Sequence, residues 1–122
     1  MVTDYGKILR TIRIEKGEVL GDMADNLNIS SAYLSSIETG TRGVPSGLTD
    51  LISSTYNLKR SIEKKLRKAE ISNMKEIKLT FDNNTSSAKK ETAYLFARTF
   101  NNIDTNDFER IREILLKKED KK

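Results

Sequence analysis

The sequence predicts a mainly α-helical protein in which five helices are followed by one short strand and two further helices. Three observations support this class. Apolar residues recur every three or four positions along most of the 122 residues, which is the spacing of helices with one buried face. Glycine, asparagine or proline interrupts that spacing repeatedly. Only residues 75–81 alternate polar and apolar side chains, as a half-buried strand does.

The first half of the chain contains the five helices. Thr3 or Asp4 can cap the first helix, Gly17 ends it, and Ser30 opens the third. Pro45 lies in a glycine-containing loop and is suited to starting the element that follows. The helices are expected at residues 4–16, 19–27, 31–38, 46–55 and 59–72, and residues 1–73 are expected to form one domain.

The second half, residues 74–122, is expected to be a strand–helix–helix segment. The strand would span residues 76–81, and a turn follows at 82–85. One helix is expected over about 86–100 and another from Asp104 or Thr105, either of which can cap it. Residues 117–122 are highly charged and are expected to fray.

Composition excludes several classes of function. The chain has no cysteine and no histidine, so the usual metal ligands, thiolate nucleophiles and imidazole bases are missing. No glycine-rich phosphate loop is present, and no apolar run approaches the roughly 20 residues that span a bilayer. We therefore expect no enzyme activity, no cofactor and no metal site. The absence of cysteine is consistent with a reducing, cytoplasmic location.

The most informative segment is residues 23–40. It reads as a short helix, a tight turn at Asn28 and Ile29, and a second helix opened by Ser30. Its apolar residues can face one core, which leaves small and polar side chains outward on the second helix. This is the outline of a helix-turn-helix, which places its second helix in a DNA groove. The residues expected in the core are Met23, Leu27, Ile29, Leu34 and Ile37.

About a dozen positions within residues 5–58 follow a pattern at fixed spacing. The pattern is Leu9-Arg10-x-Ile12-Arg13 with Gly17, Met23-Ala24-x-x-Leu27-x-Ile29-Ser30, and Leu34-Ser35-x-Ile37-Glu38-x-Gly40 with Pro45. It resembles that of the Cro/cI-type (xenobiotic-response-element) helix-turn-helix regulators. The resemblance implies a five-helix, lambda-repressor-like domain that usually acts as a dimer on an operator with two-fold symmetry.

The resemblance also implies which residues meet DNA. Base edges would be read from the second helix of the motif, and the loop after it would meet the phosphate backbone. Arg13 and Glu38 would form an ion pair that fixes the angle between two helices; the alternative is two exposed charges. The DNA-binding residues implied are Ser30, Ser31, Ala32, Tyr33, Ser35, Ser36, Thr39, Thr41 and Arg42.

Two departures from the family pattern affect specificity. Leu20 stands where the family usually has a glutamine that contacts DNA. The outward positions of the recognition helix also carry no Arg, Lys, Gln or Asn, so two-point hydrogen bonds to guanine or adenine are not available. Specificity would then depend on Tyr33, on water or on DNA shape.

Positive charge is concentrated outside the helix-turn-helix. Residues 1–58 contain five basic and seven acidic residues, whereas residues 59–122 contain seventeen basic and eleven acidic. The fifth helix is the most basic segment. Its basic residues either contact DNA phosphates or form an ordinary solvated face of the helix. The candidate phosphate contacts are Lys59, Arg60, Lys64, Lys65 and Lys68.

The C-terminal half is expected to form a homodimer. The strand would pair with its symmetry mate, and the two last helices would add an apolar surface. The alternative is that these helices fold back on the first domain. The candidate dimerisation residues are Ile77, Leu79, Phe81, Phe96, Phe100, Phe108, Ile111 and Leu115.

Together these features predict a sequence-specific, double-stranded-DNA-binding repressor, dimeric and of phage or mobile-element origin, that acts by occupying an operator. The alternative is an antitoxin, anti-CRISPR or antirepressor protein. Such a protein would use the same scaffold but bind a protein partner through its C-terminal half.

Overall fold

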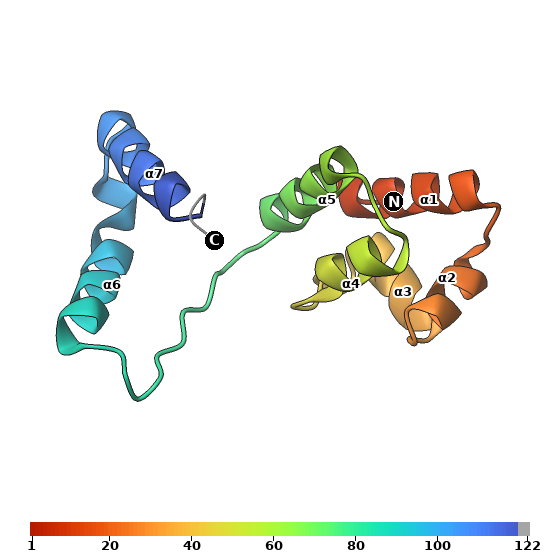
Figure 1. The fold of residues 1–122 in the computed structure, drawn as a ribbon, viewed down its shortest axis with the longest axis horizontal. Coiled ribbons are helices and arrows are strands. Elements are labelled where there is room, and N and C mark those ends of the chain that lie inside the picture. Colours follow the sequence, from red (N-terminus) through yellow and green to blue (C-terminus); the bar gives the residue numbers. More distant parts are fainter. Residues whose placement is uncertain (120–122) are drawn as a thin grey trace. The chain divides into compact units, whose positions relative to one another are not determined.

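The computed structural model describes residues 1–119, and the chain divides into two compact units, Met1–Ile77 and Lys78–Lys122. All regular structure in the described residues is helical (Figure 1). None of the described helices is both long enough and apolar enough to cross a bilayer.

The first unit contains five helices: α1 (Asp4–Lys16), α2 (Leu20–Asn26), α3 (Ser31–Glu38), α4 (Leu48–Thr55) and α5 (Arg60–Ser72). The Thr3 side chain accepts a hydrogen bond from the Gly6 amide at 3.1 Å and so caps α1. Gly17, at φ 68°, ends the helix in the left-handed conformation that glycine adopts without strain. The predicted fourth helix begins two residues late, because Gly47 has φ 86° and cannot belong to it.

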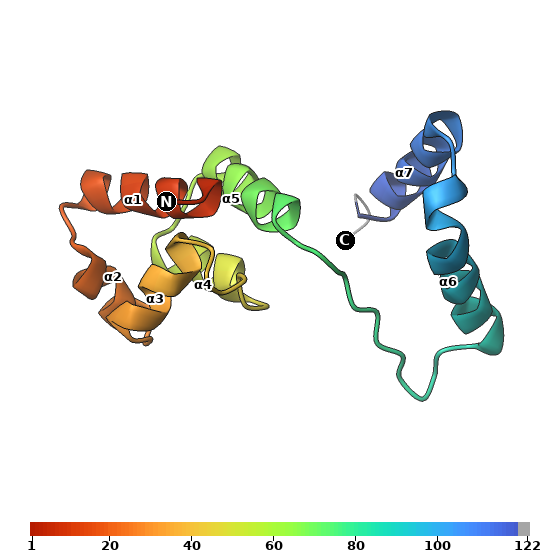
Figure 2. The same cartoon turned by 180° about the vertical axis from the view of Figure 1, so that it is seen from behind.

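The core of this unit is formed by one side of each helix. α1 packs against α3 and α5, α2 packs against α3, and α4 packs against α5 (Figures 1 and 2). The buried apolar residues therefore come from all five helices and their connections, and they make a single cluster. Its members are Tyr5, Leu9, Ile12, Met23, Ala24, Leu27, Leu34, Ile37, Leu48, Ile52, Tyr56, Leu66 and Ala69.

A chain of buried hydrogen bonds ties α1, α4 and α5 together. The Thr49 hydroxyl donates to the Glu70 carboxylate, so the Tyr5 hydroxyl, 2.9 Å from Thr49 Oγ1, is the donor in its own hydrogen bond. Arg67 donates to Glu70 at 3.3 Å and also pairs with Asp50. Every buried polar side-chain atom in the described residues has a partner.

The predicted strand at residues 76–81 is wrong, although the mainly α class is correct. Residues 76–82 have no regular structure, and Ile77, Leu79 and Phe81 are 75%, 67% and 49% exposed. An alternating pattern forms a strand only where a second strand accepts its backbone hydrogen bonds. The described residues offer no such strand.

The second unit contains α6 (Ser87–Thr99), a short 3₁₀ helix η1 (Phe100–Asn102) and α7 (Thr105–Glu119). Ser86 and Asp104 cap the two α-helices by accepting from the amides of Lys89 and Asp107. Residues 117–119 were expected in a frayed tail but continue α7, while 120–122 lie outside the described residues. No residue of these three helices is buried, so their apolar side chains lack a complete core.

Candidate nucleic-acid interface

The turn before α3 determines how this helix projects. Asn28 has φ 58°, which lets the chain reverse directly after α2. The Ser30 side chain accepts from the Tyr33 amide at 3.0 Å and caps α3. Leu34 and Ile37 are fully buried, at 0% and 1% exposure, so the opposite side of the helix must face solvent.

The solvent-facing edge of α3 consists of small side chains. Ser31, Ala32 and Ser35 are exposed, while Tyr33 and Ser36 are half-buried. Among the described residues, the Ser31 and Ser35 hydroxyls make no hydrogen bond, whereas Ser36 donates to the Tyr33 carbonyl at 2.6 Å. Ser31 and Ser35 therefore keep both donor and acceptor capacity for another molecule.

The loop after α3 lies beside this edge. The Arg42 guanidinium lies 5.5 Å from the centre of the Tyr33 ring, a cation–π contact. The Thr39 hydroxyl donates to the Ser35 carbonyl at 3.0 Å and lies 3.4 Å from that of Thr41. These contacts bring Tyr33, Thr39, Thr41 and Arg42 to one surface. The Tyr33–Arg42 contact could not be predicted from the sequence, because it joins two residues across an irregular loop.

An ion pair holds α3 against α1. Arg13 Nη2 donates to Glu38 Oε1 at 3.1 Å, and Arg13 Nη1 forms a second, shorter hydrogen bond to Glu38 Oε2. Both residues are buried, and Arg13 Nη1 also contacts the sulfur of Met23 at 3.4 Å. In addition, the amide and hydroxyl of Thr3 both donate to the Glu38 carbonyl at 2.9 Å. The end of α3 is therefore fixed to the N-cap and to the last turn of α1.

Leu20 is half-buried and packs against the core. It offers no polar group to DNA. The edge of α3 must therefore provide most of any direct base reading, without help from the start of α2.

The basic residues of α5 fall into two groups. Arg60, Lys64 and Lys68 are exposed, whereas Lys59 and Lys65, also exposed, line a groove between α1 and α5. Arg67 belongs to neither group because it pairs with Asp50 and Glu70. The nearby carboxylates keep the pKa of Arg67 above its usual value although partial burial opposes this.

The candidate dimerisation residues are divided between an apolar helical cluster and the irregular segment. Phe96, Phe100 and Phe108 pack edge to face, with ring centres 5.3–6.4 Å apart. Ile111 and Leu115 line an adjacent groove of about 420 Å³. Ile77, Leu79 and Phe81 instead lie in the irregular segment, where the ring of Phe81 contacts Lys90.

No family model matches this sequence, and no curated protein or solved structure is significantly similar to it. The function of the chain is therefore inferred from its own residues and geometry.

Proposed function

We propose that this protein is a DNA-binding transcriptional regulator that represses by occupying an operator. The observation that carries the proposal is the edge of α3. Ser31, Ala32 and Ser35 are exposed on a capped helix whose opposite side is anchored in the core. A short, rigid helix with a small-residue edge can approach base edges closely in a major groove.

The side chains on the exposed edge of α3 determine how this helix would recognise DNA bases. Serine hydroxyls can donate to or accept from any base, and the Ala32 methyl suits the methyl group of thymine. None of these side chains can form the bidentate hydrogen bonds to a base edge that discriminate best between bases. Much of the specificity would therefore come from DNA shape and deformability, with Tyr33 and Arg42 at the phosphate backbone.

Affinity independent of sequence would come from α5. Arg60, Lys64 and Lys68 are exposed and form no ion pair with a described residue. Such side chains can neutralise phosphates and release counterions, which strengthens binding to any duplex. This would compensate for the excess of acidic residues in 1–58.

A homodimer joined through the second unit completes the proposal. A pair of helices this small cannot bury its own apolar surface, and here none of its residues is buried. Phe96, Phe108 and Leu115 would be covered by the same face of a second copy. Two copies then bind two half-sites with much higher affinity than one. A cytoplasmic repressor of phage or mobile-element type, as the family resemblance implies, fits these features.

The second candidate function rests on the same uncovered surface. In an antitoxin, anti-CRISPR or antirepressor protein, the apolar face of α6 and α7 would bind a foreign protein instead of a second copy. Residues 59–122 contain seventeen basic and eleven acidic residues, with most of the excess in residues 59–77, and this supports a partner with an acidic surface.

The decisive experiment is selection of genomic fragments by the purified full chain, followed by gel retardation with the selected site. Ser35→Glu adds a negative charge to the α3 edge and should weaken binding at least about tenfold, or about 1.4 kcal/mol. Thr11→Glu adds the same charge to exposed α1 and should change affinity by less than about threefold.

The proposal fails if no fragment is enriched, or if both substitutions weaken binding equally. Failure to retard the protein's own upstream DNA, together with co-purification of a foreign protein, would favour the second candidate.

A further inference from the structure

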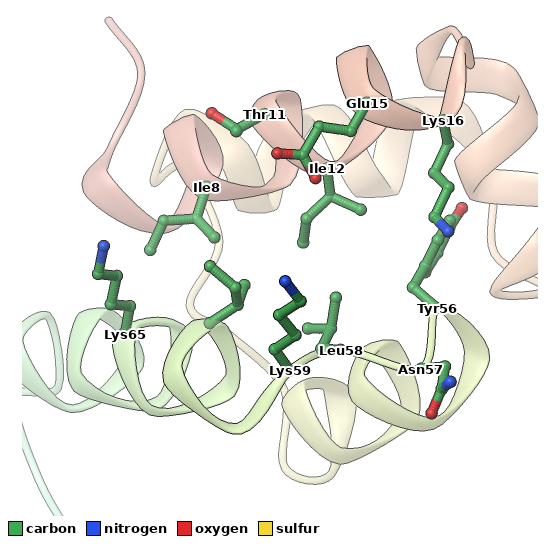
Figure 3. A pocket seen from close by; sticks show the side chains of 11 residues that line it. Ile8, Thr11, Ile12, Glu15, Lys16, Tyr56, Asn57, Leu58, Lys59 and Lys65 are labelled. Carbon is green, nitrogen blue, oxygen red and sulfur yellow. The ribbon is translucent and has the colours of Figure 1, made fainter.

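The first unit contains a groove that DNA reading does not use. It has a volume of about 410 Å³ and runs between α1 and α5 (Figure 3). Its lining comes from α1, from the connection after α4, and from α5. Ile8 and Ile12 of α1 face Leu58 across it (Figure 3). Ile62 of α5 also lines it, so its floor is apolar.

The rim of the groove is basic. Lys16, Lys59 and Lys65 line it, and Glu15 is its one acidic residue. All three lysines are exposed, and none lies within 4.0 Å of a carboxylate in residues 1–119. In Figure 3 the Lys59 amino group points into the space between the two helices. Ile12 is buried, whereas Ile8, Leu58 and Ile62 are half-buried. The groove therefore combines a partly exposed apolar floor with an excess of positive charge.

We propose that this groove docks an acidic amphipathic helix of a partner protein. Charge complementarity identifies the occupant: carboxylates on the flanks of the helix would meet the lysines, while its apolar stripe covers the exposed parts of Ile8, Leu58 and Ile62. The apolar side chains of a third helix would pack into the groove between α1 and α5, as rows of side chains pack into grooves at other helix interfaces.

This site goes beyond the proposed function because it leaves the DNA-reading edge free. Since its lining residues come from α1 and from positions 56–65, a partner can bind while Ser31, Ala32 and Ser35 remain exposed. The groove would let a second protein join the regulator on its operator. Its test needs no DNA, so its outcome is independent of whether an operator is found.

The test uses NMR of the full chain labelled at isoleucine and leucine methyl groups. The probe is a synthetic 15-residue helix with leucine along one stripe and glutamate elsewhere. Binding should shift the methyl signals of Ile8, Ile12, Leu58 and Ile62. A matched peptide with lysine in place of every glutamate should bind at least tenfold more weakly.

Two charge-reversal variants of α5 provide the control. Lys59→Glu combined with Lys65→Glu should weaken the acidic peptide at least tenfold, because both side chains line the groove. Lys64→Glu combined with Lys68→Glu makes the same charge change within α5 but outside the groove, whereas Lys59 is the N-cap of this helix. This variant should weaken peptide binding less than threefold. The methyl spectrum without peptide verifies that each variant is folded.

Four results would overturn the proposal. The first is equal affinity for the acidic and basic peptides, and the second is an equal effect of the two double variants. The third is a shift confined to methyl groups of the second unit, which would mean that the peptide binds the apolar face of α6 and α7. Sodium dodecanoate is titrated separately; if it shifts the groove methyls while the acidic peptide does not, the site takes a small anionic amphiphile instead.

Discussion

Arg13 and Glu38 form a buried ion pair with two hydrogen bonds, and this pair joins the last turn of α1 to the last residue of α3. Their side chains are only 9% and 3% exposed, so each charge depends on the other for solvation. The orientation of the proposed recognition helix is therefore set by a charged contact inside the domain.

Removal of one member of this pair should be strongly destabilising. Arg13→Ala leaves the Glu38 carboxylate buried without its partner, which should lower the free energy of unfolding by about 3–5 kcal/mol in urea denaturation. Replacing both residues (Arg13→Met with Glu38→Leu) should cost much less than the sum of the single changes. Arg10→Ala serves as the control, because Arg10 is 54% exposed and lies 3.7 Å from Glu38. It should cost less than about 1 kcal/mol.

α1 and α3 approach each other so closely at Gly6 that a larger residue there should destabilise the protein. A Cβ atom at this position would lie 2.4 Å from the Glu38 carbonyl oxygen, so Gly6→Ala must push the two helices apart. We expect a loss of about 1–3 kcal/mol in urea denaturation. In Gly21→Ala the new Cβ meets only the Ser31 hydroxyl, at 3.7 Å. This change should be neutral or stabilise α2 by up to about 1 kcal/mol; an equal loss in both variants would contradict the explanation.

Stability should fall at alkaline pH through Tyr5. Burial raises the pKa of this phenol from its ordinary value of 10.0 to about 12. Between these values the unfolded chain releases the proton and the folded protein keeps it, so rising pH favours unfolding. The contribution is complete below pH 10 and is lost as pH approaches 12, with a slope of up to about 1.4 kcal/mol per pH unit. Tyr5→Phe should show a shallower decline in denaturation series across this range; identical declines would contradict it.

The salt dependence of DNA binding should report on α5. Lys64→Gln with Lys68→Gln removes two proposed phosphate contacts and should reduce the slope of log affinity against log salt by about 2. The same two changes at Lys89 and Lys118, on α6 and α7, give a charge-matched control that should leave the slope nearly unchanged. An unaltered slope in the α5 variant would mean that its lysines are an ordinary solvated face.

Dimerisation should depend on the phenylalanine cluster. Phe108→Ala removes the ring that contacts both Phe96 and Phe100, and we expect at least a tenfold rise in the dimer dissociation constant by sedimentation equilibrium. Tyr94→Ala removes a 65% exposed aromatic ring on α6 that lies outside the cluster and should have little effect. A wild-type chain that stays monomeric at micromolar concentration would exclude this interface.

The sequence predicted the helices because their signals are local. Periodic apolar residues and caps such as Ser30 placed α1, α3 and α5 within a residue or two. The prediction of the strand was wrong because a strand depends on a non-local contact. Ile77, Leu79 and Phe81 have the right alternating pattern, but a strand also needs a neighbouring strand, which periodicity cannot reveal.

The polar contacts around the candidate site were predictable only in part. The Arg13–Glu38 spacing was suggested by a family pattern. In contrast, the hydrogen-bond chain through Tyr5, Thr49 and Glu70 gave no signal, because a threonine and a glutamate on helices ordinarily read as surface residues.

The exposed segment between α5 and α6 has a practical consequence for preparing this protein. Lys75 and Lys78 lie there in irregular backbone, which fits a protease active site far better than a helix does. Brief trypsin treatment of the native chain should cut at these lysines before it reaches those of α1 or α5. The product would be an N-terminal fragment with every buried residue of the first unit still in place, obtained without recloning.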